Sequence, residues 1–123
     1  PDARDLTVTQ WLRYHAAARG APVEGPPEEA MKAMGLLSNA ETRVAHLSGG
    51  LCERLLLARL LLAPAALVLI DHPLARLDAG GEFALSSLFE RLRGDRKAAV
   101  LWAATDKRQL EGHCDRVEPL SAP

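Results

Sequence analysis

The stretch Ser48–Asp71, SGGLCERLLLARLLLAPAALVLID, places a helix start, a proline and an apolar strand in immediate succession. The Ser48 hydroxyl can accept a hydrogen bond from a free N–H group of a first helical turn, and we expect the helix to cover residues 51–62. Pro64 ends it. The run Ala66–Ile70 has the length of a strand and no polar alternation, which is typical of a central parallel strand covered on both faces.

Gly49 and Gly50 follow this cap, although a helix start needs no glycine. Glycines beside a helix N-terminus let another group approach the backbone closely, and the free N–H groups at that end bind phosphate. We therefore interpret Ser48, Gly49 and Gly50 as candidate phosphate-binding residues. The alternative is that they only begin a helix.

The elements on either side of this stretch differ in kind. Thr7 and Gln10 have the spacing of a capping box, so we expect a helix that ends at Gly20. A second helix begins at Pro27 and reaches residue 34. After the stretch, the pattern predicts a helix over residues 81–93, a strand over 98–104 and a final helix from 106. This order predicts an α/β protein in which an all-helical part precedes a parallel sheet.

The composition describes a soluble globular chain with one core. The 123 residues are 48% hydrophobic and 25% charged, and the formal net charge of -1 argues against a nucleic-acid partner held by bulk charge. Cys52 and Cys114 are too few for a disulfide framework, which favours a reduced, cytosolic setting with Cys52 as a small buried side chain. Arg59 and Pro64 interrupt the longest apolar run, so we do not expect a membrane span.

Asp71 stands at the carboxyl end of the predicted strand. Ligands of open parallel sheets collect at that edge, and an aspartate there can hold a metal. Asp71 is therefore a candidate metal-holding residue. The alternative is a solvated aspartate that caps the next turn.

Four segments in order resemble the ATP-binding cassette (ABC) ATPase family: LSGG (47–50), LARLLLAPAALVLID (57–71), HPLARLD (72–78) and AAVLWAATD (98–106). They look like the signature motif, the signature helix with the Walker B strand, the stretch from the catalytic glutamate to the D-loop aspartate, and the last core strand with the switch histidine. The resemblance implies a P-loop NTPase-like α/β fold. Residues 1–50 would form the helical subdomain ending in the signature, and 51–123 the carboxyl half of the ATPase core.

The resemblance also implies a shared nucleotide site. In the family, two nucleotide-binding domains face each other, and the signature of one closes over the ATP γ-phosphate held by the other. Ser48, Gly49 and Gly50 would contact that phosphate, and Asp78 is the D-loop residue of the same interface. Asp71 would hold magnesium through water. ATP and Mg²⁺ are thus the implied cofactors, supplied through a partner domain or an upstream segment.

Three departures from the family pattern affect the site of the chain itself. The 123 residues contain no G-x-x-x-x-G-K-[ST] phosphate loop, and we expect the chain to begin after that loop in a longer pattern. His72 stands at the catalytic glutamate position and Asp106 at the switch histidine position. Apart from these three, Leu51 replaces the glutamine after LSGG. An exchange of roles between His72 and Asp106 stays open. We expect the chain alone to be inactive toward ATP.

These observations predict the degenerate member of an asymmetric ABC pair that powers transport. The expected partner is a second nucleotide-binding domain, with a different chain favoured over an identical one, and possible further contact with a membrane-spanning transporter subunit. The expected location is the cytoplasm or the inner face of the cell membrane. Two alternatives stay open: a non-catalytic regulatory or interaction domain with the ABC fold, and an active cassette seen only in part that tolerates His72.

Overall fold

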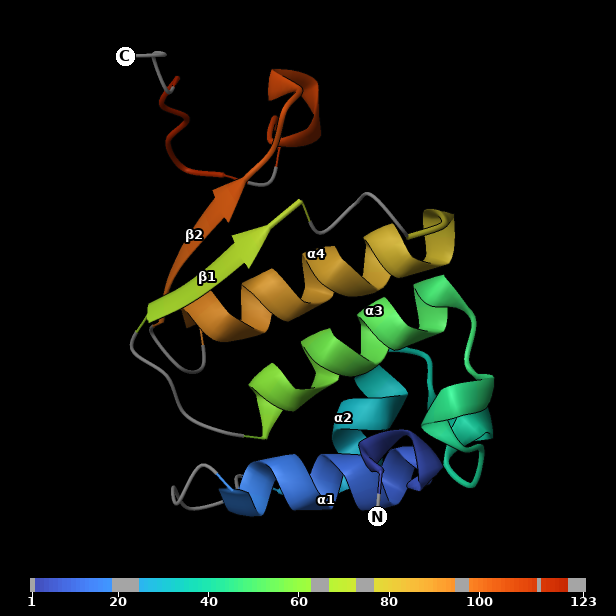
Figure 1. Ribbon diagram of the computed structural model, residues 1–123. Helices are drawn as coiled ribbons and strands as arrows, with labels where there is room; N and C mark the ends of the chain where they lie inside the picture. The colour runs from blue at the N-terminus through green and yellow to red at the C-terminus, as the bar shows by residue number, and fades with distance from the viewer. Residues whose placement is uncertain are drawn as a thin grey trace.

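A helical layer precedes a strand–helix–strand unit in the computed structural model of this protein (Figure 1). The structure describes residues 2–18, 25–62, 67–72, 77–94, 98–112 and 114–119. In Figure 1 the sheet lies above α4, α3 lies below α4, and α2 and α1 lie below α3, at the end of the molecule away from the sheet. The predicted α/β class with a parallel sheet behind a helical part is confirmed.

Helix α1 (Val8–Ala18) follows a 3-10 turn, η1 (Ala3–Asp5), and begins as the sequence predicts. The Gln10 side chain accepts a hydrogen bond from the Thr7 N–H at 2.9 Å, and the Thr7 hydroxyl accepts one from the Gln10 N–H at 3.2 Å. This reciprocal pair is a capping box. The helix buries one face, and its predicted end at Gly20 lies outside the described residues.

Helix α2 (Pro27–Ala33) has proline in its first turn and ends before Gly35, whose φ is +67°. Met31 and Met34 are fully buried and belong to the hydrophobic core. Two 3-10 turns, η2 (Leu37–Asn39) and η3 (Val44–His46), then lead to the signature-like segment.

Helix α3 (Gly49–Ala58) begins two residues earlier than predicted, directly after Ser48. It continues as a 3-10 turn, η4 (Arg59–Leu61), so the helical run ends close to the predicted residue. Cys52 is half-buried on this helix rather than fully buried as expected.

The strand–helix–strand unit consists of β1 (Leu67–Asp71), α4 (Ala79–Gly94) and β2 (Ala99–Ala103). The strands are parallel, with Leu67 opposite Ala99 and Asp71 opposite Ala103. α4 packs against β2 on one side and α3 on the other. Its packing on the sheet includes Phe89 and Trp102, whose ring centroids lie 5.0 Å apart.

The expectation that the first strand is covered on both faces is wrong for this chain. Val68 is 4% exposed in the core, whereas Leu67 and Leu69 on the opposite face are 58% and 68% exposed. Leu101 on β2 is 64% exposed beside them. The apolar run is long enough for a central strand, but the described elements cover only one of its faces.

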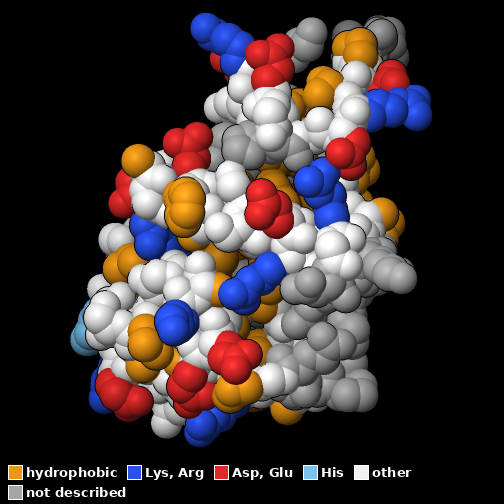
Figure 2. Space-filling model, turned by 180° about the vertical axis from the view of Figure 1, so that it is seen from behind, with side chains coloured by type: hydrophobic (Ala, Val, Ile, Leu, Met, Phe, Trp, Pro, Cys, Tyr) orange, Lys and Arg blue, Asp and Glu red, His pale blue; other side chains and the backbone are white. Residues whose placement is uncertain are grey.

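The predicted final helix is also wrong in extent, because the described residues after Asp106 form a single 3-10 turn, η6 (Lys107–Gln109). Gly112, with φ +83°, lies soon after it. None of the helices in the described part of the chain combines the length and apolar character that crossing a bilayer requires. Acidic and basic side chains intermix on the face in Figure 2.

Candidate functional site

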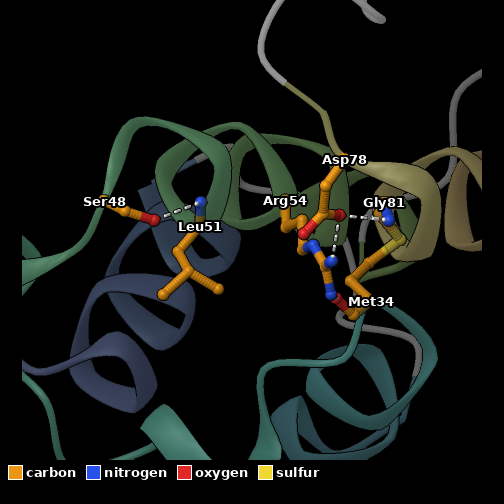
Figure 3. Close-up of polar contacts among 6 residues, drawn as sticks. All are labelled: Met34, Ser48, Leu51, Arg54, Asp78 and Gly81. Atoms are coloured by element: carbon orange, nitrogen blue, oxygen red, sulfur yellow. Dashed lines mark hydrogen bonds and ion pairs between the residues drawn. The ribbon is translucent and has the colours of Figure 1, made fainter.

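Ser48 caps helix α3, as predicted. Its backbone is extended, with φ −66° and ψ 164°, and its hydroxyl oxygen accepts a hydrogen bond from the Leu51 N–H at 3.2 Å (Figure 3). The hydroxyl proton is not used in this bond, because a serine hydroxyl can accept and donate at once. Ser48 is exposed, so the proton can be donated to a group outside the chain. Leu51 packs partly against the core.

Gly49 is the first residue of α3, and the fold gives no reason for a glycine there. Its φ lies outside the left-handed region, and a Cβ atom placed on it meets nothing within 4 Å. Gly81 in α4 is a useful contrast, since its Cβ would lie 2.8 Å from Leu77 Cδ2. Gly81 is therefore required by packing, whereas Gly49 presents an open backbone at a helix N-terminus.

Asp78 lies directly before α4 and caps it. Its Oδ1 atom accepts hydrogen bonds from the Gly81 N–H at 2.8 Å and from Arg54 Nη2 at 2.7 Å (Figure 3). The Gly81 N–H first, and then the Arg54 guanidinium, lower the pKa of the Asp78 carboxyl because both stabilise its ionised form. The side chain is 76% exposed, so the ionised carboxylate faces solvent.

Arg54 is the residue of this site that the sequence analysis missed. It stands on α3, its side chain is only 15% exposed, and its Nη1 atom lies 3.4 Å from the Met34 carbonyl oxygen. It therefore connects the helical part, α3 and the start of α4. The available signal was the pair of charged residues, Glu53 and Arg54, in a helix whose remaining residues from Leu51 to Ala58 are apolar, since a charged side chain must find a partner when it is buried.

Asp71 and His72 lie together at the carboxyl end of β1. His72 has a φ of 49°, which is uncommon for a residue other than glycine, and its N–H donates to the Ala103 carbonyl at 2.8 Å. His72 Nε2 lies 3.3 Å from Asp71 Oδ1, and the Asp71 side chain is 82% exposed. The described residues hold no group of three or more metal-ligating side chains. A single exposed carboxylate fits a water-mediated magnesium contact, not a complete metal site.

Asp106 is held by Arg108 rather than by His72. Its carboxylate accepts from the Arg108 N–H at 2.9 Å and from the guanidinium at distances of 2.9 to 3.2 Å. The Arg108 side chain first, and then its N–H, lower the pKa of the Asp106 carboxyl. The two side chains that were candidates for exchanged roles thus have separate partners, and the structure does not pair them.

Comparison with known proteins identifies relatives of this chain by sequence, although no family model matches it. It is 37% identical over 112 residues to the zinc import ATP-binding protein ZnuC of Cereibacter sphaeroides, covering 91% of this chain and 44% of the relative. It is 41% identical over 78 residues to the cytochrome c biogenesis ATP-binding export protein CcmA of Xylella fastidiosa, covering 63% of this chain and 36% of the relative.

The fold comparison agrees with the sequence comparison. A putative ABC transporter ATP-binding protein from Pyrococcus furiosus superposes with a TM-score of 0.71 at 23% identity, over 91% of this chain and 54% of that protein. The chain spans less than half the length of both curated relatives. By sequence and by fold, the chain belongs to the ATP-binding cassette family of ATPases.

Proposed function

We propose that this chain contributes its signature segment to the ATP site of a partner nucleotide-binding domain, within an assembly that uses ATP hydrolysis to drive transport. The observation that carries the proposal is the open, exposed backbone at Gly49, where the fold itself has no use for a glycine. Ser48 adds a hydroxyl proton and α3 adds the positive end of its dipole at the same point.

The chemistry of this segment suits a phosphate group. N–H groups of the first helical turn, together with a serine hydroxyl, supply neutral donors to a phosphate oxygen without the bulk of a side chain. The exposed Asp78 carboxylate at the start of α4 lies on the D-loop, which belongs to the same interface in this proposal. When bound in the partner's site, MgATP supplies the phosphoryl group that is transferred to water. Asp71 lies beside His72 at the chain's own catalytic positions, where its single carboxylate would hold magnesium only through a water molecule.

The residues at the chain's own catalytic positions support an asymmetric pair. An imidazole such as that of His72 is a poor substitute for a carboxylate base beside magnesium and phosphate. Asp106 places an anion where a donor to the γ-phosphate is needed, and Arg108 already holds it. We therefore propose a different chain as the partner, on the cytoplasmic side of a membrane-spanning subunit. The two curated relatives are ATP-binding proteins of import and export systems and do not favour a purely regulatory role.

The test uses the native assembly, purified through a tag on this chain, and measures steady-state ATP hydrolysis with Gly49→Asp. We expect hydrolysis at the partner's site to be lost, because the substitution adds both bulk and negative charge where backbone meets phosphate. Gly94→Asp is the matched control, since Gly94 also has nothing within 4 Å of an added Cβ but lies at the far end of α4. An unchanged rate with Gly49→Asp refutes the proposal.

A further inference from the structure

We propose that Arg54 is a positioning residue that fixes the Asp78 carboxylate relative to the signature segment, so that both meet the partner domain together. The proposal rests on the function proposed above and assigns Arg54 a role within it. Arg54 does not itself reach the nucleotide in this proposal; it acts through Asp78.

The first support is the way in which the Asp78 oxygens are used. The Arg54 guanidinium and the Gly81 N–H both bind Oδ1, at 2.7 and 2.8 Å. Oδ2 makes no hydrogen bond or ion pair with any residue that the structure describes. One oxygen is thus clamped by the chain, while the other remains available on a side chain that is 76% exposed. Figure 3 shows Oδ1 between the Arg54 guanidinium and the Gly81 N–H.

The second support is the space that two glycines provide for the guanidinium. A Cβ on Gly35 would lie 2.6 Å from Nη1, and a Cβ on Gly80 would lie 3.2 Å from Nη2. Gly35 belongs to the turn after α2 and Gly80 to the first turn of α4, so the two glycines beside the guanidinium come from distant parts of the sequence. The positive φ of Gly35 also requires glycine, whereas Gly80 has no such need.

The third support is the geometry that only a guanidinium provides here. Arg54 contacts the Met34 carbonyl with one terminal nitrogen and Asp78 with the other. A planar fork makes two such contacts in fixed directions, while a lysine ammonium is a point charge on a flexible stem. Because Arg54 stands six positions after Ser48 on the same α3 segment, it links the signature helix rigidly to the D-loop carboxylate.

The first arm of the test follows the Asp78 carboxyl by NMR titration of the 123-residue chain. In Arg54→Gln, which keeps a polar side chain but removes the charge, we expect the pKa of Asp78 to rise toward its ordinary value. Arg13→Gln on α1 removes an arginine from a different, exposed ion pair with Glu28 and should leave the Asp78 titration unchanged. An Asp78 titration that does not move in Arg54→Gln overturns the proposal.

The second arm is a double-mutant cycle on ATP hydrolysis by the native assembly. Arg54→Gln should lower kcat by on the order of ten- to a hundredfold, since misplacing a contact group by about an ångström has effects of this size. The same substitution in an Asp78→Asn background should cause almost no further loss, because the group through which Arg54 acts is already changed. Equal losses in both backgrounds overturn the proposal.

Two additional variants separate positioning from folding and from the proposed function. Arg54→Lys keeps the charge and should restore a low Asp78 pKa but only part of kcat, because the contact to Met34 is lost. If Arg54→Gln fails to fold, Gly80→Ala, whose Cβ would lie 3.2 Å from Arg54 Nη2, carries the titration arm, and Arg54→Lys carries the double-mutant cycle. Gly49→Asp is measured in the same assay. If its ATPase rate is unaffected, the proposed function is refuted. If its ATPase activity is lost but the effects of the Arg54 and Asp78 substitutions are additive, only the role of Arg54 is refuted.

Discussion

Replacing Gly49 by alanine should make the chain more stable and the assembly less active. The added methyl group meets nothing within 4 Å, and the backbone at Gly49 is already in a conformation that alanine adopts freely. Alanine exceeds glycine in helix propensity by about 0.8–1.0 kcal/mol at an interior position. Gly49 is the first helical residue rather than an interior one, so we expect a gain of roughly 0.5 kcal/mol.

The same methyl group has the opposite effect if phosphate must approach this backbone. Loss of one close donor to a transition-state oxygen typically costs about 3 kcal/mol, or a hundredfold or more in rate. Thermal unfolding of the 123-residue chain measures the first effect, and steady-state ATP hydrolysis by the native assembly measures the second. A rise in stability together with a fall in rate identifies a glycine that serves a ligand and not the fold.

Two glycines serve as controls for the stability measurement. Gly94→Ala is equally open and should leave ATP hydrolysis unchanged. Gly81→Ala should destabilise the chain by about 1–3 kcal/mol, because its Cβ would lie 2.8 Å and 3.0 Å from two Leu77 atoms in a buried position. The reasoning is refuted if Gly49→Ala lowers stability, or if it leaves the ATPase rate unchanged.

Four further predictions can be checked on the purified chain. Ser48→Ala should lower the free energy of unfolding by about 1 kcal/mol through loss of the cap, whereas Ser48→Asp should keep stability because aspartate caps equally well. Leu69→Lys should change stability by less than about 0.5 kcal/mol, since Leu69 is 68% exposed, and should reduce any self-association seen by light scattering; unaltered association in this variant contradicts a role for the sheet face. The lowered pKa of Asp78 means that its contribution to stability is present above the ordinary aspartate pKa and is lost as the pH falls through the lowered value; Asp78→Asn should flatten that acid limb in pH-dependent unfolding. Calorimetry of the 123-residue chain with MgATP should detect no micromolar affinity, because these residues contain no phosphate loop, and a micromolar Kd would contradict the proposed division of the site.

The parts of the fold that local chemistry determines were predictable from the sequence. The capping box at Thr7 and Gln10, the cap at Ser48 and the first-turn proline of α2 each act within one helical turn, and all are present. The apolar runs of β1 and β2 also predict a parallel pair, because a helix of suitable length separates them.

The errors arose where the outcome depends on distant parts of the molecule. An apolar strand such as Leu67–Asp71 has the same sequence pattern whether or not another element covers its second face, so the exposure of Leu69 could not be predicted. The segment after Asp106 forms a single 3-10 turn instead of the expected helix, and the Asp106 carboxylate caps this turn by accepting a hydrogen bond from the Arg108 N–H. Arg54 finds its partner 24 positions away, and no local pattern indicates such a pairing.

The polar groups of the site fall into two sets, according to whether the chain itself provides their hydrogen-bond or ion-pair partners. At the chain's own catalytic positions, His72 Nε2 lies 3.3 Å from Asp71 Oδ1 and Asp106 forms an ion pair with Arg108, so each of these groups already has a partner within two residues. A reactive group that must handle a nucleotide should instead keep its donors or acceptors available.

The groups assigned to the interface with a partner domain keep a donor or an acceptor available. Ser48 uses its oxygen lone pair for the cap and retains its proton, Gly49 leaves its backbone open, and Asp78 binds the described residues through Oδ1. Each of these features is unnecessary for the fold, because a capping aspartate, an alanine or an aspartate bound through both oxygens would stabilise the same helices equally well. Their common explanation is a ligand outside the chain, which is why variants at Gly49 and Arg54, and not those at His72, provide the decisive tests.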